Sequence, residues 1–341
     1  MREPFELDGS MVNPGERRMI NLPIPNLSSQ TPMSMPVHVV HGKQAGPVLF
    51  ISAAIHGDEL NGIEIIRHVL ASRSIRSLKG TLIAVPVVNA YGLIQGSRYL
   101  PDRRDLNRTF PGSETGSLAS RLAHQFIEKI VSVSTHGIDL HTGSGHRTNL
   151  PQIRANLDDP ETCRLAECFG APVMLNSSLR DGSLRAAANT LGVPTLLYEA
   201  GEAMRYNDIA IRAGVSGIIN VMRELGMLRS VKKTAKVRTL PFVARSSRWI
   251  RAHESGMFRA SVKLGDQVSR GDVIGYIAEA SDGARHEILS TYEGIIIGGL
   301  ELPIVHEGDA LLHIARFKAD ADDVANHVES FHQDHTPDPD D

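Results

Sequence analysis

Residues 47–71 read PVLFISAAIHGDELNGIEIIRHVLA and join a strand-like segment to a helix-like one. The first nine residues are an almost unbroken apolar run, which is typical of a strand buried on both faces by helices. The polar letters HGDE at 56–59 fall where this strand ends and the helix begins. The stretch therefore predicts an α/β unit with polar residues at a strand end.

The same alternation of strand-like and helix-like segments continues to about residue 226. Strand-like segments follow at 80–88, 137–141 and 193–201, and helix-like segments at 117–132 and 209–226. Such alternation favours a largely parallel or mixed sheet flanked by helices. Catalytic groups in such sheets gather where strands end and loops begin.

The composition is that of an ordinary globular protein, with 41% hydrophobic and 22% charged residues. A length of 341 residues exceeds that of a usual single domain, so two folded units are expected. The formal charge of −3 gives no general attraction to nucleic acid or to an anionic membrane. The first residues lack the apolar run of a secretory signal, and no run of about eighteen apolar residues occurs. We therefore expect a cytoplasmic protein that binds neither nucleic acid nor membrane.

A change of composition after Gly226 marks the predicted domain boundary. Residues 229–251 hold eight basic residues and no acidic one. Beyond them lie only strand-like and turn-like segments with recurring Gly-Asp turns, which indicate a small β-barrel or sandwich. We divide the chain into a catalytic domain at 1–228 whose N-terminal part is β-rich, a basic linker at 229–251, a β domain at 252–317, and an acidic tail at 318–341 whose last part we expect to be disordered.

His56 and Glu59 are the first candidates for a metal site. At the start of a helix, residues three apart lie on one face, where an imidazole and a carboxylate can share one ion. Zinc accepts such ligands, and catalytic zinc typically has three protein ligands and one open position. A His-x-x-Glu pair is common by chance, however, and a carboxylate that caps the helix would also explain Glu59.

His141 is a third candidate ligand at the end of another apolar segment. In a strand over 137–141, Asp139 and His141 face one way while Ile138 and Leu140 face the other. A polar pair therefore points out of an otherwise apolar element. A structural histidine held by hydrogen bonds is the alternative.

Glu199 ends a further apolar strand, in the segment VPTLLYEAG at 193–201. A carboxylate there is costly unless it has a partner or a function. Facing a metal-bound water, it could act as general base and then pass the proton to a leaving amine.

Residues 96–112 are dense in arginine and in turn-forming residues. Guanidinium groups suit carboxylate recognition because their parallel N–H donors match two oxygens. An exposed loop with surface ion pairs is the alternative for this stretch taken alone.

Four segments in this order resemble the succinylglutamate desuccinylase and aspartoacylase family, relatives of the zinc carboxypeptidases. They are HGDE at 56–59, DLNRTFPG at 105–112, DLHTG at 139–143 and EAG at 199–201, within about residues 47–226. The resemblance implies a zinc-carboxypeptidase-like mixed sheet flanked by helices. It also implies hydrolysis of the amide bond of a small N-acyl amino acid.

The resemblance assigns the metal ligands and the base. His56, Glu59 and His141 would bind one Zn²⁺ per chain. Glu199 would assist the attack of zinc-bound water on the amide carbonyl.

The same resemblance assigns the substrate-binding residues. Asn107 and Arg108 would hold a substrate carboxylate. An earlier arginine stabilises the tetrahedral oxyanion in the family, and Arg98 is the candidate, with Arg103 and Arg104 nearby in the sequence.

The β domain at 252–317 resembles the barrel-sandwich fold of biotinyl and lipoyl carrier domains. No lysine occurs from Gly265 to Leu312, so the attachment site that a carrier needs is absent. A role as a lid, at the rim of the pocket or in assembly is therefore favoured over acyl or biotin carriage, and a homo-oligomer is compatible with the sequence.

Two other functions are kept as alternatives. A metallocarboxypeptidase uses the same metal and arginine arrangement to bind peptide C-termini. A non-catalytic module would instead bind RNA or another polyanion through residues 229–251, where Phe242 and Trp249 are the only aromatic residues. A Gly-x-Ser-x-Gly elbow and a dinucleotide fingerprint are both absent from the sequence.

Overall fold

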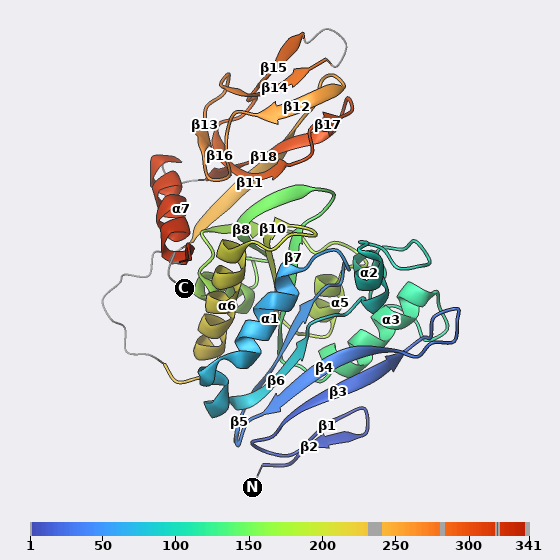
Figure 1. Cartoon of the computed structure of the whole chain (residues 1–341). Helices are drawn as coiled ribbons and strands as arrows, with labels where there is room; N and C mark the ends of the chain where they lie inside the picture. Colours follow the sequence, from blue (N-terminus) through green and yellow to red (C-terminus); the bar gives the residue numbers. More distant parts are fainter. Residues whose placement is uncertain (1, 231–240, 280–283, 318, 320, 338–341) are drawn as a thin grey trace.

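One twelve-stranded mixed sheet dominates the computed structural model, which describes residues 2–230, 241–279, 284–317, 319 and 321–337 (Figure 1). Across the sheet the strands are β3 (Arg17–Ile24), β4 (Met33–His41), β6 (Lys79–Val85), β5 (Gln44–Ala53), β7 (His136–Gly143), β10 (Thr195–Glu202), β8 (Arg147–Ala155), β9 (Val173–Asn176), β11 (Phe242–Arg251), β18 (Ala310–Phe317), β16 (Gly294–Leu300) and β13 (Gln267–Val268). A separate pair, β1 (Phe5–Leu7) and β2 (Ser10–Val12), lies near the N-terminus.

Helices cover both faces of the α/β part of this sheet. One face carries α1 (Asn61–Ala71), α4 (Pro160–Phe169) and α6 (Asp208–Glu224), and the other carries α2 (Ala90–Gln95), α3 (Leu118–Phe126) and α5 (Leu184–Thr190). Short helical turns are η1 (Arg73–Ser77), η2 (Leu106–Arg108) and η3 (Ile127–Val131). Within β5, Leu49 and Ile51 pack into the first core and Phe50 into the second, as strand geometry requires. The expected mixed α/β fold is confirmed.

The central strands bring several loops to one edge of the sheet. β5 runs parallel to β6 and to β7, and β7 runs parallel to β10. The C-terminal ends of β5, β7 and β10 therefore meet at the same edge, where functional groups gather in open α/β sheets.

Strands β11 to β18 form an all-β unit, called here the C-terminal β unit, that continues the same sheet. β11 pairs in parallel with β9, and β16 pairs antiparallel with β8. A second sheet consists of β15 (Arg285–Leu289), β14 (Val273–Ala278), β12 (Gly256–Ala260) and β17 (Ile304–Val305). Phe258, Ile277 and Ile314 belong to the apolar core of this unit. The closer likeness to a carrier-type barrel-sandwich stays a prediction.

Two segments differ from the sequence-based expectation. Residues 242–251, predicted to end the basic linker, form β11, because pairing with β9 and β18 satisfies their backbone groups on both sides. The acidic tail holds a helix, α7 (Ala321–His335), since Val324, Val328 and Phe331 form an apolar stripe that packs against the molecule.

The rest of the linker prediction, at 231–240, and the disorder expected near 338–341 lie outside the described residues. No helix in the described ranges is long and apolar enough to cross a membrane.

Gly217 on α6 lies against the ring of Phe169 on α4. A Cβ at this position would approach Phe169 Cε1 to 2.2 Å, and that ring is itself packed on Tyr198, with the ring centroids 4.9 Å apart. We expect Gly217→Ala to lower the free energy of unfolding by about 1–3 kcal/mol, because overpacking outweighs the better helix propensity of alanine. Urea unfolding measures the change. Ser216→Ala, on the exposed side of the same helix, is the control, and equal stability of the two variants would contradict the packing argument.

Candidate active site

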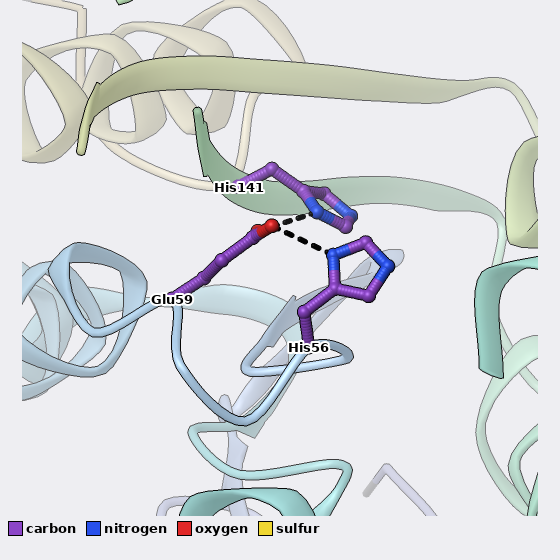
Figure 2. Close-up of side chains that lie close together, drawn as sticks. All are labelled: His56, Glu59 and His141. Atoms are coloured by element: carbon purple, nitrogen blue, oxygen red, sulfur yellow. Dashed lines mark hydrogen bonds and ion pairs between the residues drawn. The ribbon is translucent and has the colours of Figure 1, made fainter. Parts of the chain in front are cut away.

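Three side chains from distant parts of the sequence meet at the edge formed by β5 and β7. His56 follows β5, Glu59 precedes α1, and His141 lies near the end of β7. Figure 2 shows the two imidazoles pointing at the Glu59 carboxylate. Nδ1 of His56 lies 2.7 Å from Glu59 Oε1, and Nδ1 of His141 lies 2.7 Å from Glu59 Oε2. The sequence-predicted ligand set is therefore brought together in space.

The three residues fit a divalent metal ion by the chemistry of their donors. One ligand atom from each residue lies within 4.8 Å of the other two, and all three side chains are buried. Two imidazole nitrogens and one carboxylate oxygen form a ligand set that zinc accepts. Glu59 does not cap α1, whose N-cap Leu60 makes no side-chain hydrogen bond, so the capping alternative does not account for it.

Two aspartates hold the imidazoles from outside the cluster. Asp139 Oδ2 lies 2.8 Å from Nε2 of His141, and Ser52 donates a hydrogen bond of 2.7 Å to Asp139 Oδ1. Asp105 Oδ1 lies 3.1 Å from Nε2 of His56. Such contacts orient ligating imidazoles and raise their basicity.

The charges in this cluster shift the pKa of each member. Burial alone would lower the pKa of His141, but the charges of Asp139 and Glu59 and their hydrogen bonds raise it well above its usual value. Burial would also lower the pKa of His56, but the charge of Glu59 and the hydrogen bonds to Asp105 and Glu59 outweigh that effect, so that the pKa of His56 is raised. Burial alone would raise the pKa of Glu59, yet the two imidazoles depress it below its usual range. Metal binding to such protonated ligands is expected to release protons.

The cluster opens into a cavity of about 480 Å³. Residues of the α/β part and of the C-terminal β unit line this cavity. The lining residues are His56, Glu59, Arg98, Asn107, Arg108, His141, Thr142, Gly143, Ser144, Arg147, Asn149, Arg154, Ser177, Ser178, Arg180, Ser183, Arg185, Leu197, Glu199, Trp249, Arg251 and Ala310. All seven residues singled out from the sequence as ligands, base or substrate-binding groups are among them.

Glu199 lies on β10 and reaches this cavity with one carboxylate oxygen held. Asn149 Nδ2 donates a hydrogen bond of 2.8 Å to Glu199 Oε2, and Arg154 Nη2 lies 3.2 Å from the same atom. The other oxygen, Oε1, accepts no hydrogen bond from any residue in the described part of the chain.

Arg98 alone of the three candidate arginines lines the cavity. Its Nη1 lies 3.4 Å from Glu59 Oε1, and its Nε and Nη2 donate to Asp105 Oδ2 at 3.2 and 2.8 Å. Arg103 and Arg104 are exposed and do not line it. The structure therefore distinguishes Arg98 from Arg103 and Arg104, which lie in the same arginine-rich stretch of the sequence.

Asn107 and Arg108 form the short η2 turn at another wall. Asn107 Oδ1 accepts a hydrogen bond of 2.9 Å from the backbone N–H of Leu184, which fixes the orientation of the amide. Burial lowers the pKa of Arg108, Asp105 opposes this, and the nearby charges of Arg180 and Arg98 add to it. Both residues thus present N–H donors to the cavity.

Sequence reasoning missed several residues that line the same cavity. Asn149 and Arg154 lie on β8, Arg185 on α5, and Trp249 and Arg251 on β11. A signal existed in β8, since RTNLPQIRA places polar residues among buried ones in a strand. Trp249 and Arg251 were assigned to a linker, and only the pairing of β11 brings them to the cavity.

A mixed sheet with helices on both faces and a buried His–Glu–His cluster at the ends of parallel strands are the features expected of the succinylglutamate desuccinylase and aspartoacylase family. Residues 45–225, more than half of the chain, match the family model described as succinylglutamate desuccinylase/aspartoacylase catalytic domain. The chain belongs to this family.

Relatives share most of the length of the chain. An N-alpha-acetyl-L-2,4-diaminobutyric acid deacetylase from Halomonas elongata is 27% identical over 323 residues, which cover 91% of this chain and 93% of that protein. The crystal structure of a succinylglutamate desuccinylase/aspartoacylase from Rhodobacter sphaeroides has a TM-score of 0.79 at 26% identity, covering 88% of this chain and 96% of that chain. The product-bound ectoine utilization protein EutE (DoeB) from Ruegeria pomeroyi shares the fold, with a TM-score of 0.80 at 22% identity, covering 92% and 99% of the two chains. The names of the family and of the Halomonas relative indicate a deacylase.

We expect Glu59→Gln to abolish most metal binding, because its carboxylate contacts both imidazoles and carries the ligand charge. Metal content measured by mass spectrometry should fall from about one ion per chain to well below that value. Glu64→Gln, on the outer side of α1 and paired with Arg67, is the matched control. Wild-type metal content in Glu59→Gln would refute this ligand assignment.

Proposed function

We propose that this chain is a zinc-dependent amidohydrolase that removes the acyl group from a small N-acyl amino acid. One observation carries the proposal: the buried cluster of His56, Glu59 and His141 opens into the same cavity as Glu199 and Arg98. A metal site, a base and a cation beside one cavity are the components that amide hydrolysis requires. The names of the relatives support the same chemistry.

His56, Glu59 and His141 would hold the zinc ion, and Asp105 and Asp139 would keep the two imidazoles in place. A zinc ion held by these residues would polarise a carbonyl group and lower the pKa of water. In this proposal, side chains of the protein carry out proton transfer, stabilise the developing negative charge and bind the substrate.

Glu199 acts as the general base in this proposal. Asn149 and Arg154 fix its Oε2, so that Oε1 is the oxygen available to accept a proton from the attacking water. The same carboxyl group then donates that proton to the nitrogen of the leaving amino acid. Fixing one oxygen limits the positions that the other can take, which favours a productive geometry.

Arg98 stabilises the negative charge that develops on the carbonyl oxygen. Asp105 holds its Nε and Nη2, which directs Nη1 toward the cluster and His56. A donor that is already oriented costs no reorganisation during the reaction, and such a group typically contributes roughly 3–4 kcal/mol.

Asn107 and Arg108 bind the α-carboxylate of the substrate. Because Asn107 Oδ1 is engaged by Leu184, its amide nitrogen is left to donate, and Arg108 adds a positive charge beside it. This arrangement suits a carboxylate, which accepts several hydrogen bonds at once.

The C-terminal β unit limits the size of the substrate. Trp249, Arg251 and Ala310 from this unit line the cavity, whose volume of about 480 Å³ suits a small molecule. A barrel-sandwich unit that lacks a carrier lysine would serve as this wall. The wall favours deacylation over the trimming of long peptides, and it also gives Trp249 and Arg251 a role other than RNA binding.

Glu199→Gln should lose most turnover while it keeps its metal. An amide cannot accept the proton, so kcat should fall by about 10²–10⁴-fold, as release of amine from an N-acyl amino acid will show. Glu202→Gln on the same strand, outside the cavity lining, is the control and should keep most of its activity. A rate unchanged in Glu199→Gln would rule out this base.

Substrate length tests the role of the wall. The chain should hydrolyse N-acetyl amino acids far faster than it trims peptides of six or more residues, and Trp249→Ala should shift that ratio toward peptides by removing an indole from the wall. Trp249→Phe keeps an aromatic ring and is the matched control. Efficient trimming of long peptides by the unmodified chain, with inert N-acyl amino acids, would favour a carboxypeptidase instead.

A further inference from the structure

A second cavity, of about 770 Å³, lies at the edge of the sheet opposite to the candidate active site. The end of β4, the starts of β5 and β6 and the end of α1 contribute to its walls. Because β5 and β6 run parallel, their starts share the edge opposite to the one where β5 leads into His56. Helix α1 begins just after Glu59 and ends at Ala71 in the wall of this cavity, so it spans the distance between the two edges (Figure 1). Among the described residues, none lines both cavities.

Five basic side chains line this second cavity, called here the basic cavity, and they come from five separate segments: Arg17, Lys43, Arg76, Lys79 and Arg229. None of the five has a carboxylate within 4.0 Å in the described part of the chain. The chain as a whole has a formal charge of −3. A general excess of basic residues therefore does not explain why these five gather around one hollow.

Glu16 is the one acidic residue in the lining, and its charge is already balanced. Its Oε1 accepts a hydrogen bond of 2.9 Å from Arg18 Nε, and its Oε2 accepts one of 2.9 Å from the backbone N–H of Asn13. The hydrogen bond from Asn13, followed by the contacts with Arg18, lowers the pKa of Glu16. This carboxylate is therefore engaged outside the set of five cations.

Backbone hydrogen bonds hold the segments that carry the cations in fixed relative positions. The N–H of Gly15 donates to the carbonyl of His41 at 2.6 Å, and the N–H of Lys79 donates to the carbonyl of Met227 at 2.8 Å. The buried His41 ring is itself held, with Nδ1 2.9 Å from Thr81 Oγ1, and burial lowers its pKa. The walls of the basic cavity are thus formed before any ligand binds, which lowers the entropic cost of binding.

Contacts within the chain account for one of the five cations. Arg17 Nη1 donates a hydrogen bond of 2.8 Å to the carbonyl of Leu70 in the last turn of α1, where a positive charge is favourable. The stem of Lys43 crosses the backbone at Gly15, where a Cβ would lie 2.7 Å from Lys43 Cε. The charged ends of the four cations other than Arg17 make no hydrogen bond to any described residue.

Like charges around a hollow produce a local positive potential. All five side chains are exposed, so water solvates each of them at little cost. A cleft lined by charges of one sign focuses the electric field and raises the local concentration of ions of the opposite sign. Lysine and arginine both bind phosphate and carboxylate groups, the first as a point charge and the second through parallel N–H donors. The lining therefore matches an anionic ligand.

We propose that the basic cavity is a second binding site, separate from the active site, for a small polyanion with two or more phosphate or carboxylate groups. Its volume of about 770 Å³ lies within the roughly 300–1,000 Å³ of small-molecule sites. Because the cations stand on separate segments, a ligand with several anionic groups can contact more than one of them. A hollow admits a small molecule, whereas nucleic acid and membranes are bound by extended basic surfaces. The proposal does not depend on the deacylase function.

Calorimetric titration of the full-length, zinc-loaded chain tests the proposal with three probes at constant ionic strength. Tripolyphosphate and propane-1,2,3-tricarboxylate carry several anionic groups of one kind each, and orthophosphate is the single-group reference. At least one polyanion should bind at least about tenfold tighter than orthophosphate, and its affinity should fall as the ionic strength rises. The tighter of the two identifies the anionic group. Zinc content after the titration checks that the probe has not removed the metal.

Variants locate the bound polyanion. The double variant Lys43→Gln/Lys79→Gln should weaken its binding by at least about tenfold, because two charged contacts are lost. Arg76→Gln should act in the same direction and serves if the double variant does not fold. Lys129→Gln, which removes a surface lysine paired with Asp8 outside both cavities, is the matched control and should bind as the unmodified chain does.

Arg108→Gln distinguishes the two cavities, because Arg108 lines only the candidate active site. Polyanion binding that survives in Arg108→Gln and is lost in the lysine double variant supports the proposal. The reverse pattern would place the ligand in the active site and overturn it. Absence of saturable binding for both polyanions would overturn it too. So would retention on single-stranded RNA or on phosphatidylserine vesicles that depends on the same lysines while neither small polyanion binds.

Discussion

The buried carboxylate of Glu59, held between two imidazoles, is the interaction on which the candidate site depends. With 2% of its surface exposed, it is stabilised by His56, His141, Arg98 and the backbone N–H of Thr142. His56 follows strand β5 and His141 lies on β7, and these strands are parallel neighbours in a register that sets Ala53 beside Leu140. A slip of one residue in that register would turn His141 to the other face of the sheet. The order and register of these strands therefore determine whether the His–Glu–His cluster can form.

Strand β8 links this constraint to the rest of the cavity. It pairs with β10 along one side, and on the other side with β9 near its end and with β16 near its start. The same strand thus carries Asn149 and Arg154 to Glu199 and carries Arg147 to Trp249 of the C-terminal β unit. The two residues that contact Glu199 and the residue that contacts the C-terminal β unit therefore lie on one strand. Any movement of the C-terminal β unit would be transmitted to β8 through the pairing with β16.

The sequence predicted the parts of the site that local pattern encodes. Apolar runs that end in polar residues revealed His56, Glu59, His141 and Glu199, and the alternation of segments revealed the α/β fold. Contacts that depend on irregular or long-range pairing were not predictable. Asn149 and Arg154 are five apart and would face opposite sides of a regular strand, yet both reach Glu199 Oε2 because the register with β10 shifts beside that residue. The basic composition of residues 229–251 gave no sign of strand β11, whose formation depends on its pairing with β9 and β18. Arg98 could not be told from Arg103 and Arg104 without the loop geometry that turns it toward Asp105.

Charge is distributed differently in the His56–Glu59–His141 cluster and in the rest of the cavity. The motifs by which the chain resembles its family supply His56, Glu59, His141, Glu199, Asn107 and Arg108, and within the cluster the charges of Glu59 and the imidazoles oppose each other. Four of the seven arginines that line the cavity lie on β8, α5 and β11, outside those motifs. A change in any of these elements alters the electrostatic potential of the cavity without disturbing the cluster.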